Sequence, residues 1–304
     1  MNKINMSRTC VAFPGREAVL KGFDKTFYNN FNISKEVVEY ISDTLHEDIL
    51  GMCLNKIDMP EEMTAVCLVA HCYSLYKAVE SVYGTPECFA GYSQGEFCAC
   101  AAAGMFEITD ALKLILNLER LLLKTSAEAE SMVRVIDLDI EILKVICREI
   151  DPSGKKLCVS AYISNNQNIV SGKKDELKKL RAAAKNNGAR WVLNLDSKRA
   201  YHSSLCSDAA QSAKKYFDSI ILSKPGRYIY SCFDGQGSKN ENTALKKLSK
   251  QITSPIQWKK LVANLYIRGI NNILEIGPGC TVSANSRIAQ PDMNCIWIGS
   301  VDDL

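Results

Sequence analysis

The sequence predicts an α/β protein built from a large domain with a parallel sheet and a small inserted subdomain. Over the first 130 residues, short apolar strands alternate with longer helical stretches, as in parallel sheets covered by helices. Between 132 and 198 the expected order changes to β-α-β-β-α-β, that of a ferredoxin-like module. The rest of the large sheet is expected after about residue 199. We therefore expect a large domain formed by 1–130 and 199–304 and a ferredoxin-like subdomain at 131–198.

The large domain is expected to begin with a short buried strand, Val11-Ala12-Phe13, which ends at a Pro-Gly turn. Apolar residues at helical spacing predict a helix within 34–58 and a nearly all-apolar, buried helix from Met63 to Val82. A strand at Phe89-Ala90 then leads through a turn into a helix that runs to Ala103. A further helix is expected from Thr109, as its N-cap, to Lys124.

In the small subdomain, alternating and continuous apolar runs predict four strands, and two amphipathic stretches predict helices. The expected strands are 132–138, 156–164, 167–172 and 189–196, and the expected helices are 139–150 and 173–188. Gly188 is expected to stop the second helix.

Composition places the chain among soluble globular proteins, because 47% of its 304 residues are hydrophobic and 23% are charged. No apolar run reaches the roughly 18 residues of a membrane span. The first residues, MNKINMSRTCVAF, contain no apolar signal-peptide core, so we expect a cytoplasmic protein without a membrane partner. A net charge of +3 is too small to predict nucleic-acid binding, although it would tolerate acidic partners.

The thirteen cysteines are scattered through apolar segments of a long chain. Their odd number and the lack of a secretion signal predict reduced, buried thiols rather than disulfides. None of them forms a CxxC pair or a Cys/His cluster with the spacing of a zinc site, so we expect no metal.

Residues 91–95, Gly-Tyr-Ser-Gln-Gly, mark the turn between the strand at 89–90 and the next helix. Glycines at such a turn allow close backbone contacts that a Cβ atom would prevent. The turn would raise the Ser93 hydroxyl above the sheet and place the following amide at a helix N-terminus, as at the nucleophile of an α/β-hydrolase-like domain. Taken alone, this five-residue pattern is explained equally well by chance and by a nucleophilic serine.

A serine nucleophile needs a base, and the chain has three histidines. His46 lies in a polar helical stretch and is most simply a solvated surface residue. His71 lies inside an apolar helix, where a hydrogen-bonded core histidine is the simpler interpretation. His202 follows the last strand of the insert at the start of a new helix, so position and elimination favour it, with a helix-capping or loop role equally open.

Five motifs occur in one order along the chain: FPG at 13–15, GYSQGE at 91–96, AYHSSL at 200–205, QITSPIQW at 251–258 and LEIGPGCTVS at 274–283. With them the chain resembles the malonyl-CoA:acyl carrier protein transacylase family over about residues 10 to 300. That family includes the acyltransferase domains and the free-standing acyltransferases of polyketide synthases.

The resemblance implies a ping-pong acyl transfer in which Ser93 attacks a thioester and His202 takes its proton. It also implies that a backbone carbonyl at Gln251 orients His202, and that the backbone N–H groups of Gln94 and Arg16 form the oxyanion hole. Arg16 replaces the family's usual Gln, but a backbone donor tolerates that change. The implied substrates are acyl-CoA and an acyl carrier protein, whose phosphopantetheine thioester reacts, with no bound cofactor. We expect a monomer.

The chain departs from the family in the acyl pocket. An ungapped alignment puts Leu118 where malonyl-using members carry an arginine that pairs with the substrate carboxylate, and Arg120 would face away. Burying a carboxylate without a partner costs several kcal/mol, so malonyl should be a poorer substrate by on the order of a hundredfold. Tyr92 replaces the usual His, and the other expected pocket residues are Tyr201, Ala65 and Ala161, the last two in place of Gln and Asn.

Three functions fit these expectations. A transferase would load an acyl group without a free carboxylate onto a carrier protein in polyketide-type biosynthesis. A proofreading hydrolase would let water resolve the acyl-Ser93 ester and so clear acyl groups from carrier proteins. A catalytically silent docking protein would have lost Ser93 or His202, and both are present.

Overall fold

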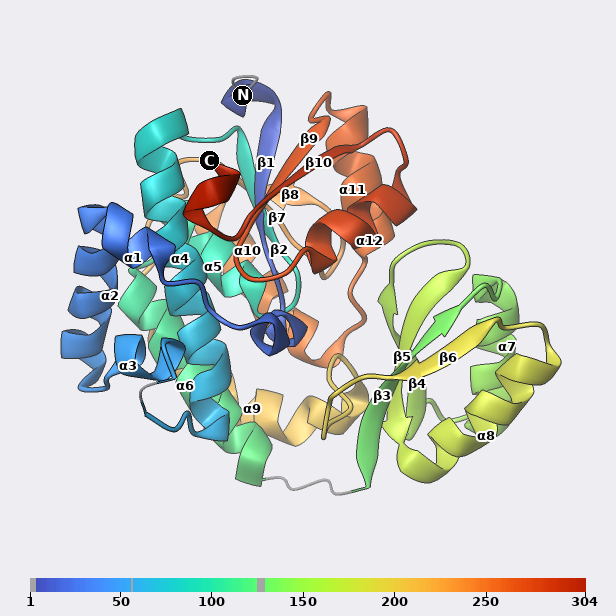
Figure 1. Cartoon of the computed structure of the whole chain (residues 1–304). Coiled ribbons are helices and arrows are strands. Elements are labelled where there is room, and N and C mark those ends of the chain that lie inside the picture. Colours follow the sequence, from blue (N-terminus) through green and yellow to red (C-terminus); the bar gives the residue numbers. More distant parts are fainter. Residues whose placement is uncertain (1–3, 56, 125–128) are drawn as a thin grey trace.

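The computed structural model describes residues 4–55, 57–124 and 129–304, so parts of the expected 1–130 segment lie outside the described residues. It contains a six-stranded sheet of order β10-β9-β1-β2-β7-β8 and a four-stranded sheet of order β4-β5-β3-β6. The two sheets form separate bodies joined by connecting segments (Figure 1). The predicted class, an α/β protein with a parallel sheet and a second small sheet, is confirmed.

Five strands of the large sheet are parallel, and only the short β8 is antiparallel, to β7. The central strand β1 is buried along its whole length, which explains why its sequence is continuously apolar. The strands are β1 (Thr9–Phe13), β2 (Cys88–Gly91), β7 (Tyr228–Tyr230), β8 (Gly237–Ser238), β9 (Asn272–Ile276) and β10 (Asn294–Ile298).

Helices cover both faces of this sheet because alternate side chains of β1 point to opposite sides. Val11 and Phe13 pack in one core cluster with residues of α2, α4, α5 and α6. Cys10 and Ala12 belong to a second cluster with residues of α11 and α12, on the opposite side of the sheet in Figure 1. The helices of the large domain are α1 (Thr26–Asn30), α2 (Asn32–Leu45), α3 (Ile49–Cys53), α4 (Thr64–Tyr83), α5 (Gly95–Ala102), α6 (Ile108–Lys124), α9 (Ser207–Asp218), α10 (Glu241–Lys250), α11 (Trp258–Ile267) and α12 (Thr281–Ala289).

The small sheet is antiparallel throughout and follows the predicted β-α-β-β-α-β order. One face packs against its two helices around a core that includes Val133, Val170 and Leu180. The other face contributes Met132, Ala161 and Ile169 to a cluster shared with the large domain. Its elements are β3 (Glu130–Ile136), α7 (Ile140–Ile150), β4 (Leu157–Tyr162), β5 (Gln167–Lys173), α8 (Lys174–Asn186) and β6 (Trp191–Asn194).

Backbone hydrogen bonds join the small sheet to the large domain. The N–H of Tyr162 donates to the carbonyl of Ile256 at 2.8 Å, and the N–H of Ile256 donates to the carbonyl of Ser160 at 2.9 Å. Because Ile256 lies just before α11, β4 is fixed against the large domain near the cavity described below.

Two local predictions differ from the structure. The helix expected within 34–58 is divided into α2 and α3, because His46 ends α2 in the left-handed conformation with φ 56°. Thr109 is the second residue of α6 and is buried, so it does not cap the helix from outside. Within the part of the chain that the structure describes, none of the helices combines the length and apolar character needed to cross a membrane.

Candidate active site

The turn between β2 and α5 depends on its two glycines. A Cβ atom at Gly91 would overlap the backbone nitrogen of Glu96, and one at Gly95 would overlap the carbonyl oxygen of Phe13 at the end of β1. Between them, Ser93 has φ 56°, a left-handed conformation that few non-glycine residues adopt. The sequence thus builds a sharp strand-to-helix turn that presents the Ser93 side chain.

Ser93 and His202 lie within hydrogen-bond distance although they are far apart in the sequence. The Oγ of Ser93 is 2.7 Å from Nε2 of His202, and Nδ1 of His202 is 2.8 Å from the carbonyl oxygen of Gln251. A carbonyl oxygen can only accept, so Nδ1 carries the proton and Nε2 is left free to accept the Ser93 hydroxyl proton. This is the geometry of an activated serine, with a backbone carbonyl in the place of a carboxylate.

His202 is neutral in this environment at ordinary pH. Burial lowers its pKa from 6.5 to about 4, and the hydrogen bond to the Gln251 carbonyl acts against that decrease. The neutral imidazole is the form that can accept a proton. His202 also has φ 56°, so both residues of the pair have left-handed backbones.

The two amides expected to form the oxyanion hole stand at helix starts. Gln94 directly precedes α5, and Arg16 is the first residue of a short 3-10 helix, Arg16–Lys21. Among the residues that the structure describes, neither backbone N–H donates to a protein acceptor. Both donors are therefore available for a developing negative charge beside Ser93.

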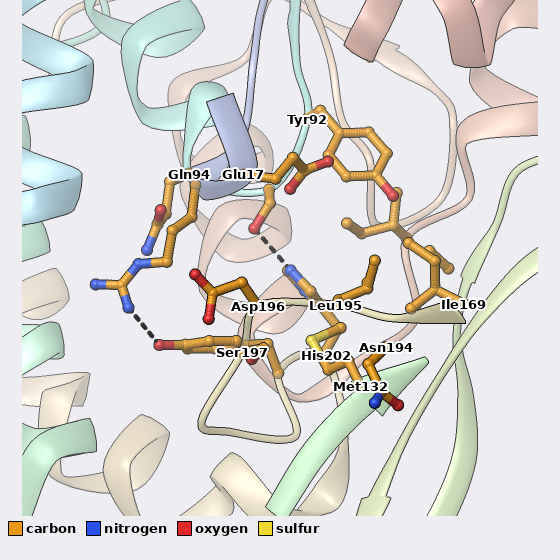
Figure 2. A pocket seen from close by; sticks show the side chains of 15 residues that line it. Glu17, Tyr92, Gln94, Met132, Ile169, Asn194, Leu195, Asp196, Ser197 and His202 are labelled. Atoms are coloured by element: carbon orange, nitrogen blue, oxygen red, sulfur yellow. Dashed lines mark hydrogen bonds between the residues drawn. The ribbon is translucent and has the colours of Figure 1, made fainter. Parts of the chain in front are cut away.

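Ser93 and His202 line a cavity of about 380 Å³ between the large domain and the small subdomain. Figure 2 shows the side chains around it. The small sheet supplies Met132, Ala161 and Ile169 to its walls, and the large domain supplies Tyr92 and Ile256. The remaining lining residues are Arg16, Glu17, Gln94, Asn194, Leu195, Asp196, Ser197 and Tyr201. The cavity has the mixed apolar and polar lining expected of a small-molecule site.

The predicted pocket residues divide into two groups. Tyr92, Tyr201 and Ala161 line the cavity. Ala65 and Leu118 do not line the cavity, so the prediction that they are pocket residues is wrong. Both are buried in the core cluster formed by α2, α4, α5 and α6, Ala65 in the first turn of α4 and Leu118 on α6. The apolar side chain of Leu118 packs with the core instead of facing the cavity.

Glu119 of α6 contacts two residues that line the cavity, and no pattern in the sequence predicts this role. Its Oε2 is 2.8 Å from Nη2 of Arg16, and its Oε1 accepts a hydrogen bond of 2.6 Å from Nε2 of Gln94. Arg16 also donates from Nη1 to the Tyr201 hydroxyl at 2.7 Å. A step from 118 to 119 turns a helix by about 100°, so only the phase of α6 could have distinguished the two positions.

Burial and neighbouring charges shift the pKa values of Glu119 and Arg16 in opposite directions. Burial raises the pKa of the Glu119 carboxyl, while the guanidinium groups of Arg16 and Arg199 and the Gln94 amide act against the rise. Burial lowers the pKa of Arg16, but the charge of Glu119 acts against this and the net pKa is raised. A guanidinium stays charged at any ordinary pH, so we regard the contact as an ion pair.

Glu17 and Tyr92 lie together in the cavity wall (Figure 2), and atoms of both lie within 3.4 Å of where a Cβ atom at Gly15 would be. Within the described residues, the Tyr92 hydroxyl and Oε1 of Glu17 are buried without a hydrogen-bond partner. Burial raises the pKa of both groups, and the nearby Glu17 carboxyl raises that of Tyr92 further. Tyr92 is one of the pocket residues predicted from the sequence, whereas no sequence pattern predicts Glu17.

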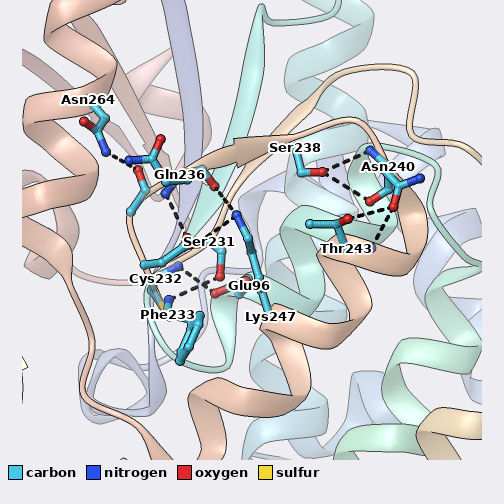
Figure 3. Close-up of polar contacts among 12 residues, drawn as sticks. Glu96, Ser231, Cys232, Phe233, Gln236, Ser238, Asn240, Thr243, Lys247 and Asn264 are labelled. Carbon is cyan, nitrogen blue, oxygen red and sulfur yellow. Dashed lines mark hydrogen bonds and ion pairs between the residues drawn. The ribbon is translucent and has the colours of Figure 1, made fainter.

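A second layer of contacts supports the segment that orients His202. Glu96, buried in α5, accepts a hydrogen bond of 2.9 Å from the N–H of Cys232, as Figure 3 shows. The Cys232 thiol is 3.0 Å from Oε1 of Gln251, and Nε2 of Gln251 is 3.3 Å from the Ser93 carbonyl oxygen. Gln251 therefore connects to the serine turn through its side chain and to His202 through its backbone.

Comparisons with known proteins relate this chain to acyltransferases. Residues 47–290 match the family model described as acyl transferase domain. The malonyl CoA-acyl carrier protein transacylase of Staphylococcus aureus (strain MRSA252) is 25% identical over 303 residues, which cover 98% of each chain. The transacylase of the same name from Buchnera aphidicola subsp. Schizaphis graminum (strain Sg) is 27% identical over 286 residues, or 91% of each chain.

Solved structures show the same fold. An acyl carrier protein S-malonyltransferase from Vibrio cholerae O1 biovar eltor superposes with a TM-score of 0.90 at 21% identity, with 98% of each chain covered. PlMCAT, a malonyl-transacylase solved in complex with the type II polyketide synthase acyl-carrier protein AntF, superposes with a TM-score of 0.89 at 22% identity, covering 98% of this chain and 97% of that one. The fold class predicted from the sequence is thus also that of its structural neighbours.

Proposed function

Because the chain belongs to the family of acyl transferase domains, we propose that it is a serine-dependent acyltransferase working by a ping-pong mechanism. It would move an acyl group from acyl-CoA or an acyl carrier protein to the phosphopantetheine thiol of a carrier protein. The observation that carries this proposal is the chain of contacts from Ser93 Oγ to His202 Nε2 at 2.7 Å and from His202 Nδ1 to the Gln251 carbonyl at 2.8 Å.

In the first half-reaction, Ser93 Oγ attacks the thioester carbonyl carbon while its proton passes to Nε2 of His202. The carbonyl oxygen becomes an oxyanion that the N–H groups of Gln94 and Arg16 stabilise. When this intermediate collapses, the carbon–sulfur bond breaks and the departing thiolate takes the proton from His202. The product is an ester between the acyl group and Ser93.

The second half-reaction reverses these steps with a new thiol. The carrier-protein thiol gives its proton to His202 as its sulfur attacks the acyl-Ser93 ester. Collapse of the second tetrahedral intermediate breaks the bond to Ser93 Oγ, which regains a proton from His202. Because the Gln251 carbonyl can only accept, Nδ1 of His202 keeps its proton throughout, and Nε2 is the nitrogen that takes and returns the transferred proton.

The acyl group would lack a free carboxylate. Arg16 is the one Lys or Arg among the described residues that line the cavity, and its guanidinium already contacts Glu119 and Tyr201. Two acidic side chains, Glu17 and Asp196, line the same cavity. A malonyl carboxylate would lose its hydration there and meet acidic groups, which costs several kcal/mol. Although the named relatives are malonyl transacylases, we therefore propose an uncharged acyl group, in polyketide-type biosynthesis.

Intact-protein mass spectrometry of wild type and Ser93→Ala tests the nucleophile. After incubation with acetyl or longer acyl thioesters, the wild type should gain one acyl mass, and Ser93→Ala should gain none because the attacking oxygen is absent. Ser197→Ala is a matched control, since Ser197 lines the same cavity without contacting His202, and it should still be acylated. Acylation of Ser93→Ala at the wild-type rate would refute the mechanism.

The same experiment separates the other two functions. An acyl-enzyme that persists until a carrier protein removes its acyl group identifies a transferase. If the acyl-enzyme instead decays in water with release of free acid, the protein is a hydrolase of carrier-protein thioesters. Binding of a carrier protein with no acyl-enzyme from any donor would identify a docking protein.

A further inference from the structure

Glu119 makes contact with both residues whose backbone amides form the proposed oxyanion hole. One carboxylate oxygen accepts from the Gln94 side chain at 2.6 Å, and the other pairs with the Arg16 guanidinium at 2.8 Å. Gln94 and Arg16 come from different strand ends, after β2 and after β1. A single buried side chain of α6 thus links the two segments that must hold their N–H groups at a fixed separation.

Glu119 lies behind the cavity wall and does not line the cavity itself. Its side chain is 2% exposed, whereas that of Arg16 is 22% exposed and faces the cavity. A substrate therefore meets the guanidinium, whose charge is balanced from behind. The Nε of Arg16 and the Oε1 of Gln94 are buried and unpaired among the described residues, so both side chains retain hydrogen-bonding capacity.

We propose that Glu119 is a positioning and specificity-determining residue, which ties Gln94 to Arg16 at the oxyanion hole and neutralises Arg16, the one Lys or Arg among the described residues that line the cavity. This inference deepens the proposed function, because it names the residue that restricts the site to acyl groups without a carboxylate. The two roles can be separated, since positioning depends on the reach of the side chain and selectivity on its charge.

Glu119→Gln removes the charge and keeps the length. An amide oxygen can still accept from Arg16, and a flipped Gln94 can offer its free Oε1 to the new amide nitrogen. The unbalanced guanidinium should then attract a substrate carboxylate. The ratio of malonyl to acetyl acylation rates, measured by rapid quench and intact mass, should increase about tenfold or more.

Glu119→Asp keeps the charge and shortens the side chain by one methylene, so it cannot hold both partners. The maximal rate of acetyl acylation should decrease by about tenfold or more, because displaced donors stabilise the oxyanion poorly. The donor concentration at half-maximal rate should stay within about threefold, and the malonyl-to-acetyl ratio should not increase. A purely structural role would not separate the two variants in this way.

Two further variants serve as controls. Glu130→Gln alters another buried carboxylate with a cationic partner, Lys173 at 2.7 Å, and should leave the malonyl-to-acetyl ratio unchanged. Adding Arg16→Leu to Glu119→Gln should abolish the gain in that ratio, because the guanidinium is then missing while the backbone N–H remains.

The outcomes distinguish this inference from the proposed function. The inference is overturned if folded Glu119→Gln shows the wild-type ratio, or if wild type already accepts malonyl as well as acetyl. Should Glu119→Gln not fold, an unchanged maximal rate in Glu119→Asp would overturn the positioning role. Failure of the wild type to form an acyl-enzyme with any donor would instead refute the proposed function.

Discussion

Ser93 and His202 share a backbone conformation that non-glycine residues rarely adopt, with φ 56° at each. Such conformations cost of order 1–3 kcal/mol and persist only where the surrounding structure enforces them. Gly91 and Gly95 allow the close turn in which Ser93 adopts this conformation, and the Gln251 carbonyl fixes the ring of His202. The fold thus maintains two costly conformations at the two residues proposed to react.

The lowered pKa of His202 predicts the pH dependence of acylation. With a pKa of about 4, roughly nine-tenths of the imidazole is neutral at pH 5, whereas an unperturbed histidine of pKa 6.5 would be mostly protonated. The single-turnover rate of acetyl transfer to Ser93 should therefore change little between pH 7.5 and 5.5, and should decrease only as the pH approaches 4. A tenfold decrease between pH 7 and 5.5 in the folded enzyme would contradict the environment described for His202.

At the scale of elements, the β2-turn-α5 unit carries the clearest structural requirement. Gly91→Ala places a Cβ atom against the backbone of Gly95 and Glu96, which cannot move independently of the serine turn. We expect a loss of about 3 kcal/mol in the free energy of unfolding and a decrease in Ser93 acylation. Urea denaturation and acyl-enzyme formation measure the two effects.

Gly226→Ala is the matched control for that substitution. Its Cβ would lie 3.8 Å from its nearest neighbour, the carbonyl oxygen of Ala103, an ordinary van der Waals contact. Stability and acylation should both stay close to wild type. If the two alanine variants behaved alike, the close approach at Gly91 would not be what shapes the turn.

Some of the elements that form the site could be predicted from the sequence and others could not. The serine turn and the position of His202 after the small subdomain follow from local patterns and motif order, and the structure brings Ser93, His202 and the Gln251 carbonyl together. The contact of α6 with the site, made by Glu119, could not be predicted in this way. An ungapped alignment gives positions along a helix but not which side chain faces the cavity, so it points to Leu118 and carries no signal for Glu119.

At the scale of the molecule, the cavity lies where the small sheet packs against the residues around the serine turn. Met132 and Ile169 come from the small sheet, whereas Tyr92 and Ile256 come from the large domain. The β-α-β-β-α-β order could be predicted from periodicity, but the position of that sheet over Ser93 depends on long-range contacts such as those between Ile256 and β4. Such contacts leave no local signal in the sequence.

The most direct test of the central claim is the intact mass of the wild-type enzyme after separate, equal exposures to acetyl and malonyl thioesters. The claim is that Ser93 forms an ester with acyl groups that lack a carboxylate. We expect an acetyl increment that maps to Ser93, and malonyl loading slower by on the order of a hundredfold, because the one cation among the described lining residues, Arg16, is already paired with Glu119. Malonyl loading as fast as acetyl loading, or an increment on another residue, would contradict the claim.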